Sequence, residues 1–399
     1  MRRGVLAVAL VGLWGPSCGR APNADEAARP EPAPRTTPAA AGAYGGRSPK
    51  GQATPGAPPT DGGAVGLEEA MGPGGTVGGG VPAGEALGGD ALGGQAPDGL
   101  DEDLVFPGVG RSHRVLSQSL RDAAPTRFKP VGTSSLVYQM RLAGTVDAAF
   151  RPRSRRHPRG HLAEVAAYRV ARALGMENVP PAVLRRVSRQ ELRTHLHPDF
   201  RDAWDSLEAE TLWDPDGTVL GAAVFWIPEM SELGVDAEPG LAAWTRVLQQ
   251  AGDGIPPGED ALHRDLARMV AFDYLIGNAD RFSGSNAQGL VGPPRRVFVR
   301  DHNLAFPGSL RPERHQRIRG ALLRTEKASR RFLEGLLELD GPRLRGILEV
   351  PAGEVGAAGS GLLLDEAQLD GVADRREALL SFFGALVDRH GAAAALPFP

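Results

Sequence analysis

The chain has 399 residues, with 45 basic and 48 acidic side chains, 53 glycines, 34 prolines and one cysteine. Gly and Pro are concentrated in residues 19–105, where they make up 33 of 87 positions and Tyr44 is the only aromatic residue. Such a segment cannot bury enough apolar surface to offset the entropy of ordering its backbone. The rest, from residue 106, carries 38 basic and 36 acidic side chains. This balance excludes the strong basic excess typical of nucleic-acid binders, so we expect no nucleic-acid partner.

The first residues are typical of a secretory signal. Arg2 and Arg3 precede an apolar run, residues 5–14, that is too short to span a bilayer. Cys18 stands where bacterial lipoprotein signals place their lipidated cysteine, although the residues before it depart from the usual Leu-Ala-Gly. An ordinary signal peptide with an incidental cysteine is the alternative. Gly19, in place of Asp, resembles lipoproteins sent to the outer membrane. We therefore expect an exported protein, held on a membrane by a lipid anchor and facing the periplasm or the cell surface.

These patterns divide the chain into three parts. Residues 1–18 form the predicted signal peptide, residues 19–105 a flexible Gly/Pro/Ala-rich linker, and residues 106–399 a folded domain. The folded part contains no cysteine, so no disulfide stabilises it. We expect it to be a monomer.

The folded part starts with strands and ends with helices. Alternating apolar residues predict a hairpin over residues 127–142 and a strand over 146–152, and helical spacing predicts a helix over 161–174. The segment 179–183 is expected to be extended. We then expect a strand over 219–227, a helix over 262–275, a short strand over 297–299 and helices over 330–339, 343–348 and 375–389. The order predicts an α+β fold with a small α/β lobe, about residues 106–228, on a larger, mainly helical lobe, about residues 229–399.

The most informative stretch is residues 272–306, which reads FDYLIGNADRFSGSNAQGLVGPPRRVFVRDHNLAF. A helix ends near Gly277, Asp280 and Asn286 follow in a polar loop, and a Val/Phe strand ends at Asp301. Phosphoryl transfer needs a carboxylate that orients the attacking hydroxyl, and an Asn and a second carboxylate that hold metal across the phosphates. These residue types occur here in that chain order.

The stretch resembles a group of atypical kinases with a protein-kinase-like core. It is similar to the secreted casein-kinase and four-jointed families, to the HipA-like bacterial kinases and, more distantly, to the phosphoinositide lipid kinases. Their shared signature is a helix ending in D-x-L-x-x-N-x-D-R, a downstream Asn, and a strand that ends in Asp. The matching residues are Asp273, Leu275, Asn278, Asp280, Arg281, Asn286 and Asp301.

The resemblance implies a two-lobed protein-kinase-like fold and a role for each residue. Asp280 would be the catalytic carboxylate, Asn286 a metal or phosphate ligand, and Asp301 the metal ligand. The helix over residues 161–174 resembles the group's regulatory helix, so Glu164 would pair with the phosphate-binding cation. The implied cofactors are ATP or another nucleotide and Mg²⁺ or Mn²⁺, and the implied acceptor is a hydroxyl of a protein or glycan.

The chain departs from the group in two places. Arg151 stands in Phe-Arg-Pro where the group has Phe-Lys-Pro, and a planar guanidinium does not replace an ammonium at a phosphate. Arg151 remains the first candidate to bind phosphate and to pair with Glu164, and Lys129 on the preceding strand is the second. Asp301 is followed by His302 rather than Asn-Gly. These departures, and the scarcity of ATP outside the cytoplasm, keep two alternatives open: a catalytically inactive kinase fold used as a surface-anchored binding module, and a nucleotidyl transferase on the same core.

Some patterns carry simpler interpretations. Asp280-Arg281 could be a surface ion pair and Asp301 a turn residue. Residues 263–266, HRDL, mimic a kinase catalytic loop, but Val270 occupies the position that requires Asn. Helical spacing around Asp265 predicts that it lies inside a helix. His195-Leu196-His197 is interpreted as a polar helix end rather than a metal site.

The anchor is testable through the single cysteine. Cys18→Ser should move the protein from the membrane to the soluble fraction, because it removes the thiol that would carry the lipid. Fractionation followed by immunoblotting measures this. A variant that stays membrane-bound would contradict lipidation at Cys18.

Overall fold

The computed structural model describes residues 100, 103–132, 135–144, 146–252, 254–281, 287–351 and 361–399. The predicted signal peptide, Cys18 and Asn286 lie outside these ranges, as does the predicted linker apart from residues 100 and 103–105.

The first half of the described chain builds a five-stranded antiparallel sheet in the order β1-β2-β3-β5-β4. Its strands are β1 (Pro125–Pro130), β2 (Tyr138–Leu142), β3 (Asp147–Pro152), β4 (Ala182–Ser188) and β5 (Thr218–Phe225). In β3, buried Ala148, Phe150 and Pro152 alternate with half-buried Asp147, Ala149 and Arg151. This alternation turns Phe150 into the core and Arg151 to the other face of the sheet.

Two helices cover opposite faces of this sheet. Helix α1 (His113–Asp122) packs Leu116 and Leu120 against the face that carries Phe150. Helix α2 (Gly160–Ala173) packs against the other face, where β5 contributes Leu220 and Ala222 to the same core as the helix. Arg151 and α2 therefore lie on the same side of the sheet.

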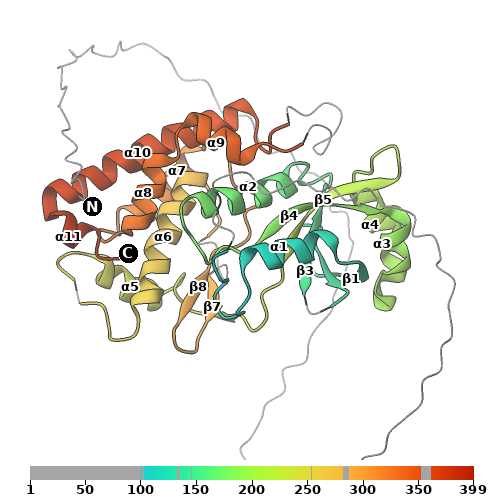
Figure 1. The fold of residues 1–399 in the computed structure, drawn as a ribbon, viewed down its shortest axis with the longest axis horizontal. Coiled ribbons are helices and arrows are strands. Elements are labelled where there is room, and N and C mark those ends of the chain that lie inside the picture. Colours follow the sequence, from blue (N-terminus) through green and yellow to red (C-terminus); the bar gives the residue numbers. More distant parts are fainter. Residues whose placement is uncertain are drawn as a thin grey trace, which may run out of the picture. The chain divides into compact units, whose positions relative to one another are not determined.

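Most elements after β5 form a mainly helical region, whereas the short helices between β4 and β5 lie beside the five-stranded sheet (Figure 1). Helix α3 (Arg189–Thr194), the 3₁₀ turn η1 (Pro198–Ala203) and α4 (Trp204–Glu210) precede β5. A small antiparallel sheet consists of β6 (Ser231–Glu232), β7 (Gln288–Leu290) and β8 (Arg296–Phe298). The helices are α5 (Gly240–Leu248), α6 (Asp260–Ile276), α7 (Pro312–Leu322), α8 (Arg330–Glu338), α9 (Gly341–Leu348), α10 (Glu366–His390) and α11 (Ala392–Ala395).

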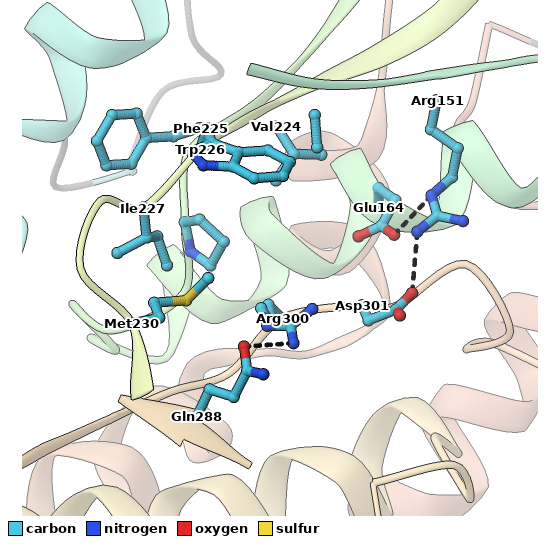
Figure 2. Close-up of a pocket in the computed structure, with 12 residues that line it drawn as sticks. Arg151, Glu164, Val224, Phe225, Trp226, Ile227, Met230, Gln288, Arg300 and Asp301 are labelled. Atoms are coloured by element: carbon cyan, nitrogen blue, oxygen red, sulfur yellow. Dashed lines mark hydrogen bonds and ion pairs between the residues drawn. The ribbon is translucent and has the colours of Figure 1, made fainter. Parts of the chain in front are cut away.

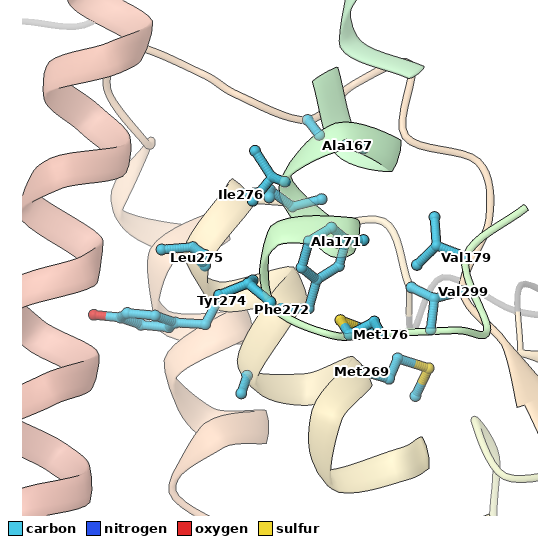
Figure 3. Close-up of a cluster of buried hydrophobic side chains, with 14 of the residues drawn as sticks. Ala167, Ala171, Met176, Val179, Met269, Phe272, Tyr274, Leu275, Ile276 and Val299 are labelled. Atoms are coloured by element: carbon cyan, nitrogen blue, oxygen red, sulfur yellow. The ribbon is translucent and has the colours of Figure 1, made fainter. Parts of the chain in front are cut away.

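One apolar core joins α2 to the helical region. Figure 3 shows Ala167 and Ala171 of α2 beside Phe272 and Ile276 of α6, with Val299 nearby. All five side chains are buried or nearly so. The small alanines allow α2 and α6 to approach closely, which fixes α2 relative to the end of α6 and to the segment after β8.

The structure confirms the expected fold class, a small antiparallel sheet lobe with a helical part. The predicted hairpin, the helix over residues 161–174 and the strand over 219–227 match β1–β2, α2 and β5 within a few residues. The helix predicted over 375–389 is longer at its start, because Asp365 and Gln368 form a capping box that begins α10. Helices α1, α5 and α7 were not predicted. No described helix is both long and apolar enough to cross a membrane.

The packing between β5 and β3 next to Arg151 can be tested at Gly221. A Cβ at this position would lie 2.6 Å from the Phe150 ring and 2.8 Å from the Arg151 carbonyl oxygen, and Phe150 is fully buried. Gly221→Ala should therefore lower the free energy of unfolding by about 1–3 kcal/mol. Gly384→Ala in α10 is the control, because its Cβ meets nothing within 4 Å. The control should stabilise the protein by roughly 0.5–1 kcal/mol. Urea denaturation measures both, and equal effects would contradict the packing.

Candidate functional site: a cleft between the sheet and the helical region

A cavity of about 250 Å³ lies where β3, β5 and α2 meet the segments around β7 and β8 (Figure 2). One part of its lining is apolar, and Figure 2 shows Phe225, Trp226, Ile227 and Met230 together there. The other part is charged or polar and consists of Arg151, Glu164, Gln288, Arg300 and Asp301. An apolar wall beside a few polar groups is typical of small-molecule sites.

Arg151 links three parts of the cleft. Its Nε lies 3.2 Å from Glu164 Oε1, and its Nη2 donates to Asp301 Oδ1 at 3.0 Å. Its Nη1 donates to the hydroxyl of Ser135 at 2.9 Å. The expected ion pair with Glu164 is thus present and is made by Arg151. Lys129 lies two strands away, on β1, and does not line the cavity.

Glu164 is 3% exposed and has partners on two elements. Besides Arg151, its Oε2 accepts from the backbone N–H of His302 at 3.1 Å and lies 3.5 Å from His302 Nδ1. Burial alone would raise the pKa of the Glu164 carboxyl, but the contacts with His302 and the charge of Arg151 hold it well below its ordinary value. Glu164 is therefore an anion, and His302 in place of Asn adds a contact to it.

Asp301 is partly open to the cleft, with its side chain 36% exposed. Its backbone is left-handed, with φ of 63°, a conformation that Asp tolerates better than most residues and that is often found at functional sites. With its amide nitrogen turned toward Asp301, Asn303 donates to Oδ1 at 2.8 Å. Oδ1 is therefore shared by Arg151 and Asn303, and within the described residues Oδ2 accepts no hydrogen bond.

Asp280 is held at the end of α6 by a buried pair. Gly277 ends the helix in a left-handed conformation, and Asn278 N–H donates back to the Asp273 carbonyl. Arg281 is 2% exposed, and its Nε donates to Asp273 Oδ2 at 2.8 Å. Between these fixed residues Asp280 is exposed, with its N–H donating to Asn278 Oδ1 at 3.3 Å. Arg281 is therefore a buried structural clamp at the end of α6.

Arg281 also reaches the cleft. Its Nη1 donates to the carbonyl of Arg300 at 2.6 Å, which ties the end of α6 to the residue before Asp301. The structure brings Arg151, Glu164 and Asp301 together along the cavity, whereas Asp280 and Lys129 are not among its lining residues. Asn286 lies outside the described residues, so the expected cleft of Asp280, Asn286 and Asp301 stays a prediction.

The donor set fits a metal held partly by a ligand. Among the described residues, no three Asp, Glu, His or Cys side chains gather as a metal site. Mg²⁺ is commonly bound by one or two carboxylates plus substrate phosphates. Asp301 Oδ2, which accepts no hydrogen bond within the described residues and lies at the cavity, is compatible with that arrangement.

The simpler interpretations of two motifs are confirmed. Asp265 is fully buried inside α6, and Arg296 of β8 donates to its Oδ2 at 2.6 Å. It is a structural ion-pair partner on a helix, not a loop residue. His195 ends α3, and the ring of His197 accepts from Asp199 N–H at the start of η1.

Three polar or aromatic residues of the cleft were not predicted as site residues from the sequence: Trp226, Gln288 and Arg300. Arg300 had a signal, because it directly precedes Asp301 in a stretch of otherwise apolar residues, VFVRD. A charge at the end of a buried strand needs a partner or a ligand. Nothing comparable marked Gln288, which faces the cavity only because β7 pairs with β8.

Comparisons with known proteins place this fold among kinases. No family model and no curated protein sequence matches the chain. The crystal structure of the Golgi casein kinase is similar at a TM-score of 0.52 and 14% identity, covering 71% of this chain and 78% of that one. The structure of hydra Fam20 with sugar is similar at a TM-score of 0.51 and 15% identity, covering 70% and 90%. The chain shares the kinase-like fold of these proteins.

The clamp between Asp273 and Arg281 generates a prediction. Arg281→Met leaves the buried Asp273 carboxylate without its cation, which should cost about 3–5 kcal/mol in the free energy of unfolding. Arg295→Met is the matched control, because Arg295 pairs with Glu259 near the surface and should cost about 1 kcal/mol or less. Guanidinium denaturation measures both. A similar cost for the two variants would show that Arg281 does not hold the loop.

Proposed function

We propose that this protein is an atypical kinase-like enzyme, which transfers phosphate from ATP or another nucleotide to a hydroxyl of a protein or glycan. The observation that carries the proposal is the Arg151 bridge at the edge of the cavity. It joins β3, the buried carboxylate of α2 and the exposed carboxylate of Asp301, and an apolar wall lies beside it. Removing charged side chains from water costs free energy, and clefts that contain such charges are candidate binding sites for charged ligands.

In this proposal the chain's own residues divide the work. The apolar wall around Trp226 and Met230 takes the flat base of the nucleotide. Asp301, together with Asn286 from outside the described residues, would hold Mg²⁺ or Mn²⁺, which would neutralise charge on the phosphates. Asp280, exposed at the end of α6, accepts a hydrogen bond from the acceptor hydroxyl and orients its oxygen for attack. The Golgi casein kinase is a kinase by name, and the shared fold supports phosphotransfer.

One observation favours a second function. Arg151 Nη2 already occupies Asp301 Oδ1, the carboxylate that the resemblance assigns to metal. A protein that keeps this ion pair would hold the two regions together without catalysing transfer. Such a protein would be an inactive kinase fold that acts as a surface-anchored binding module.

We also propose that the protein is exported and lipid-anchored through Cys18, with residues 19–105 as the linker to the folded part. This rests on the sequence pattern of the first residues and on the Gly/Pro-rich composition that follows them.

Variants of Asp280 and Asp301 test the proposed enzyme, through phosphate transfer and through nucleotide binding. Asp280→Asn should lower phosphate transfer about 100-fold or more and leave nucleotide affinity nearly unchanged, because Asp280 orients the acceptor. Asp301→Ala should abolish the part of nucleotide binding that depends on Mg²⁺ or Mn²⁺. Asp388→Ala, exposed on α10, is the control. Transfer is measured with labelled nucleotide on a protein and a glycan acceptor, and binding by thermal shift with and without metal.

Wild-type protein that binds nucleotide but transfers no phosphate under any of these conditions would contradict the enzyme and support the binding module. An Asp301→Ala variant with unchanged metal-dependent binding would contradict the assignment of Asp301.

A further inference from the structure

Arg300 is a charged side chain of the cleft to which neither the motif nor the resemblance gives a role. It directly precedes Asp301 and lines the cavity (Figure 2). Its Nη2 donates to Gln288 Oε1 at 2.6 Å, and its carbonyl is held by Arg281 at 2.6 Å. The position of Arg300 is therefore fixed from two sides, by β7 and by the end of α6.

Arg300 makes no direct hydrogen bond or ion pair with an acidic side chain in the part of the chain that the structure describes. Within the described residues it forms no ion pair, its one hydrogen-bond partner is the neutral Gln288, and its buried Nε has no partner. A half-buried cation without a counter-ion is costly, and a ligand that brings negative charge relieves that cost.

Arg151 differs in this respect. Each of its three guanidinium nitrogens already faces a partner: Glu164, Asp301 or Ser135. The cation that the resemblance assigns to phosphate is therefore occupied by the protein itself, and Arg300 is the cavity-lining cation with donors to spare.

We infer that Arg300 is the phosphate-binding residue of the cleft, and that Arg151 is a structural bridge. The inference rests on the proposed function in that the phosphates belong to a nucleotide. A guanidinium carries five N–H donors and no acceptor, and it recognises phosphate with charge-assisted, often paired hydrogen bonds. Gln288 uses one donor and sets the plane of the group.

The surroundings favour phosphate over a base as the partner of Arg300. In Figure 2, Arg300 lies between Gln288 and Asp301, while Trp226 and Ile227 form the apolar wall on another side. A base placed against that wall directs its phosphates toward Arg300 and Asp301. The proposed metal ligand and the proposed phosphate-binding residue are then consecutive in the chain.

The test is calorimetric titration of the full chain with pyrophosphate, ADP, ATP and adenosine. The variants are compared in the absence of divalent metal, and the wild type is also titrated with Mg²⁺ present. Arg300→Met should weaken pyrophosphate and ADP about 10- to 100-fold, the loss of one or two charge-assisted hydrogen bonds, and change adenosine less than about twofold. Arg300→Lys should fall between wild type and Arg300→Met, because an ammonium keeps the charge but not the paired donors. Arg295→Met, which removes a nearby surface charge outside the cavity, should bind like wild type. Circular dichroism confirms that each variant is folded, and Arg300→Lys decides the outcome if Arg300→Met does not fold.

Four other outcomes would contradict either the role of Arg300 or the proposed function. Unchanged pyrophosphate affinity in Arg300→Met, or in Arg300→Lys if only that variant folds, would overturn the inference. An adenosine loss as large as the ADP loss would assign Arg300 to the base and overturn it too. Wild-type protein that binds pyrophosphate but neither ADP nor ATP, with or without metal, would overturn the proposed function and keep the phosphate site. Wild-type protein that binds none of these would overturn both.

Discussion

The cleft depends on one guanidinium. Arg151 stands on β3 and joins the buried Glu164 of α2 to Asp301 in the segment after β8. Removing Arg151 would leave the buried Glu164 carboxylate without this cation, and such a loss costs several kcal/mol in typical buried pairs. A single planar group with three donor directions therefore ties both α2 and Asp301 to β3. A lysine ammonium is a point charge and does not impose that geometry.

The helical side of the cleft is fixed by a second buried pair. Asp273 and Arg281 close the end of α6, and Arg281 then holds the carbonyl of Arg300. Two consecutive residues are thus held from different sides. Arg151 of the sheet contacts the Asp301 side chain, and Arg281 at the end of α6 contacts the Arg300 carbonyl. Asp280 lies outside these pairs and is exposed. The buried charges position the backbone, and in the proposed function the exposed carboxylate of Asp280 orients the acceptor.

Much of this could be predicted from the sequence, because local patterns specified it. Period-two alternation gave β1, β2 and β3, helical spacing gave α2 and α6, and the order of elements gave the α+β class. The pairing of Arg151 with Glu164 followed from the resemblance. The contact between Arg151 and Asp301 did not, because it joins residues 150 positions apart and depends on how β3 faces the segment after β8. Arg300 was not predicted as a site residue for a similar reason. Only the tertiary structure shows that its guanidinium lines the cavity and donates to the neutral Gln288 rather than to a carboxylate.

The central claim is that this cleft holds a nucleotide, with metal at Asp301 and phosphates at Arg300. The most direct measurement is an X-ray structure of crystals grown with ADP and Mn²⁺, collected where manganese scatters anomalously. The account predicts a base against Trp226, phosphates within hydrogen-bond distance of Arg300, and an anomalous peak at coordination distance from Asp301 Oδ2. Crystals that bind ADP elsewhere, or a cleft with neither nucleotide nor manganese, would contradict it.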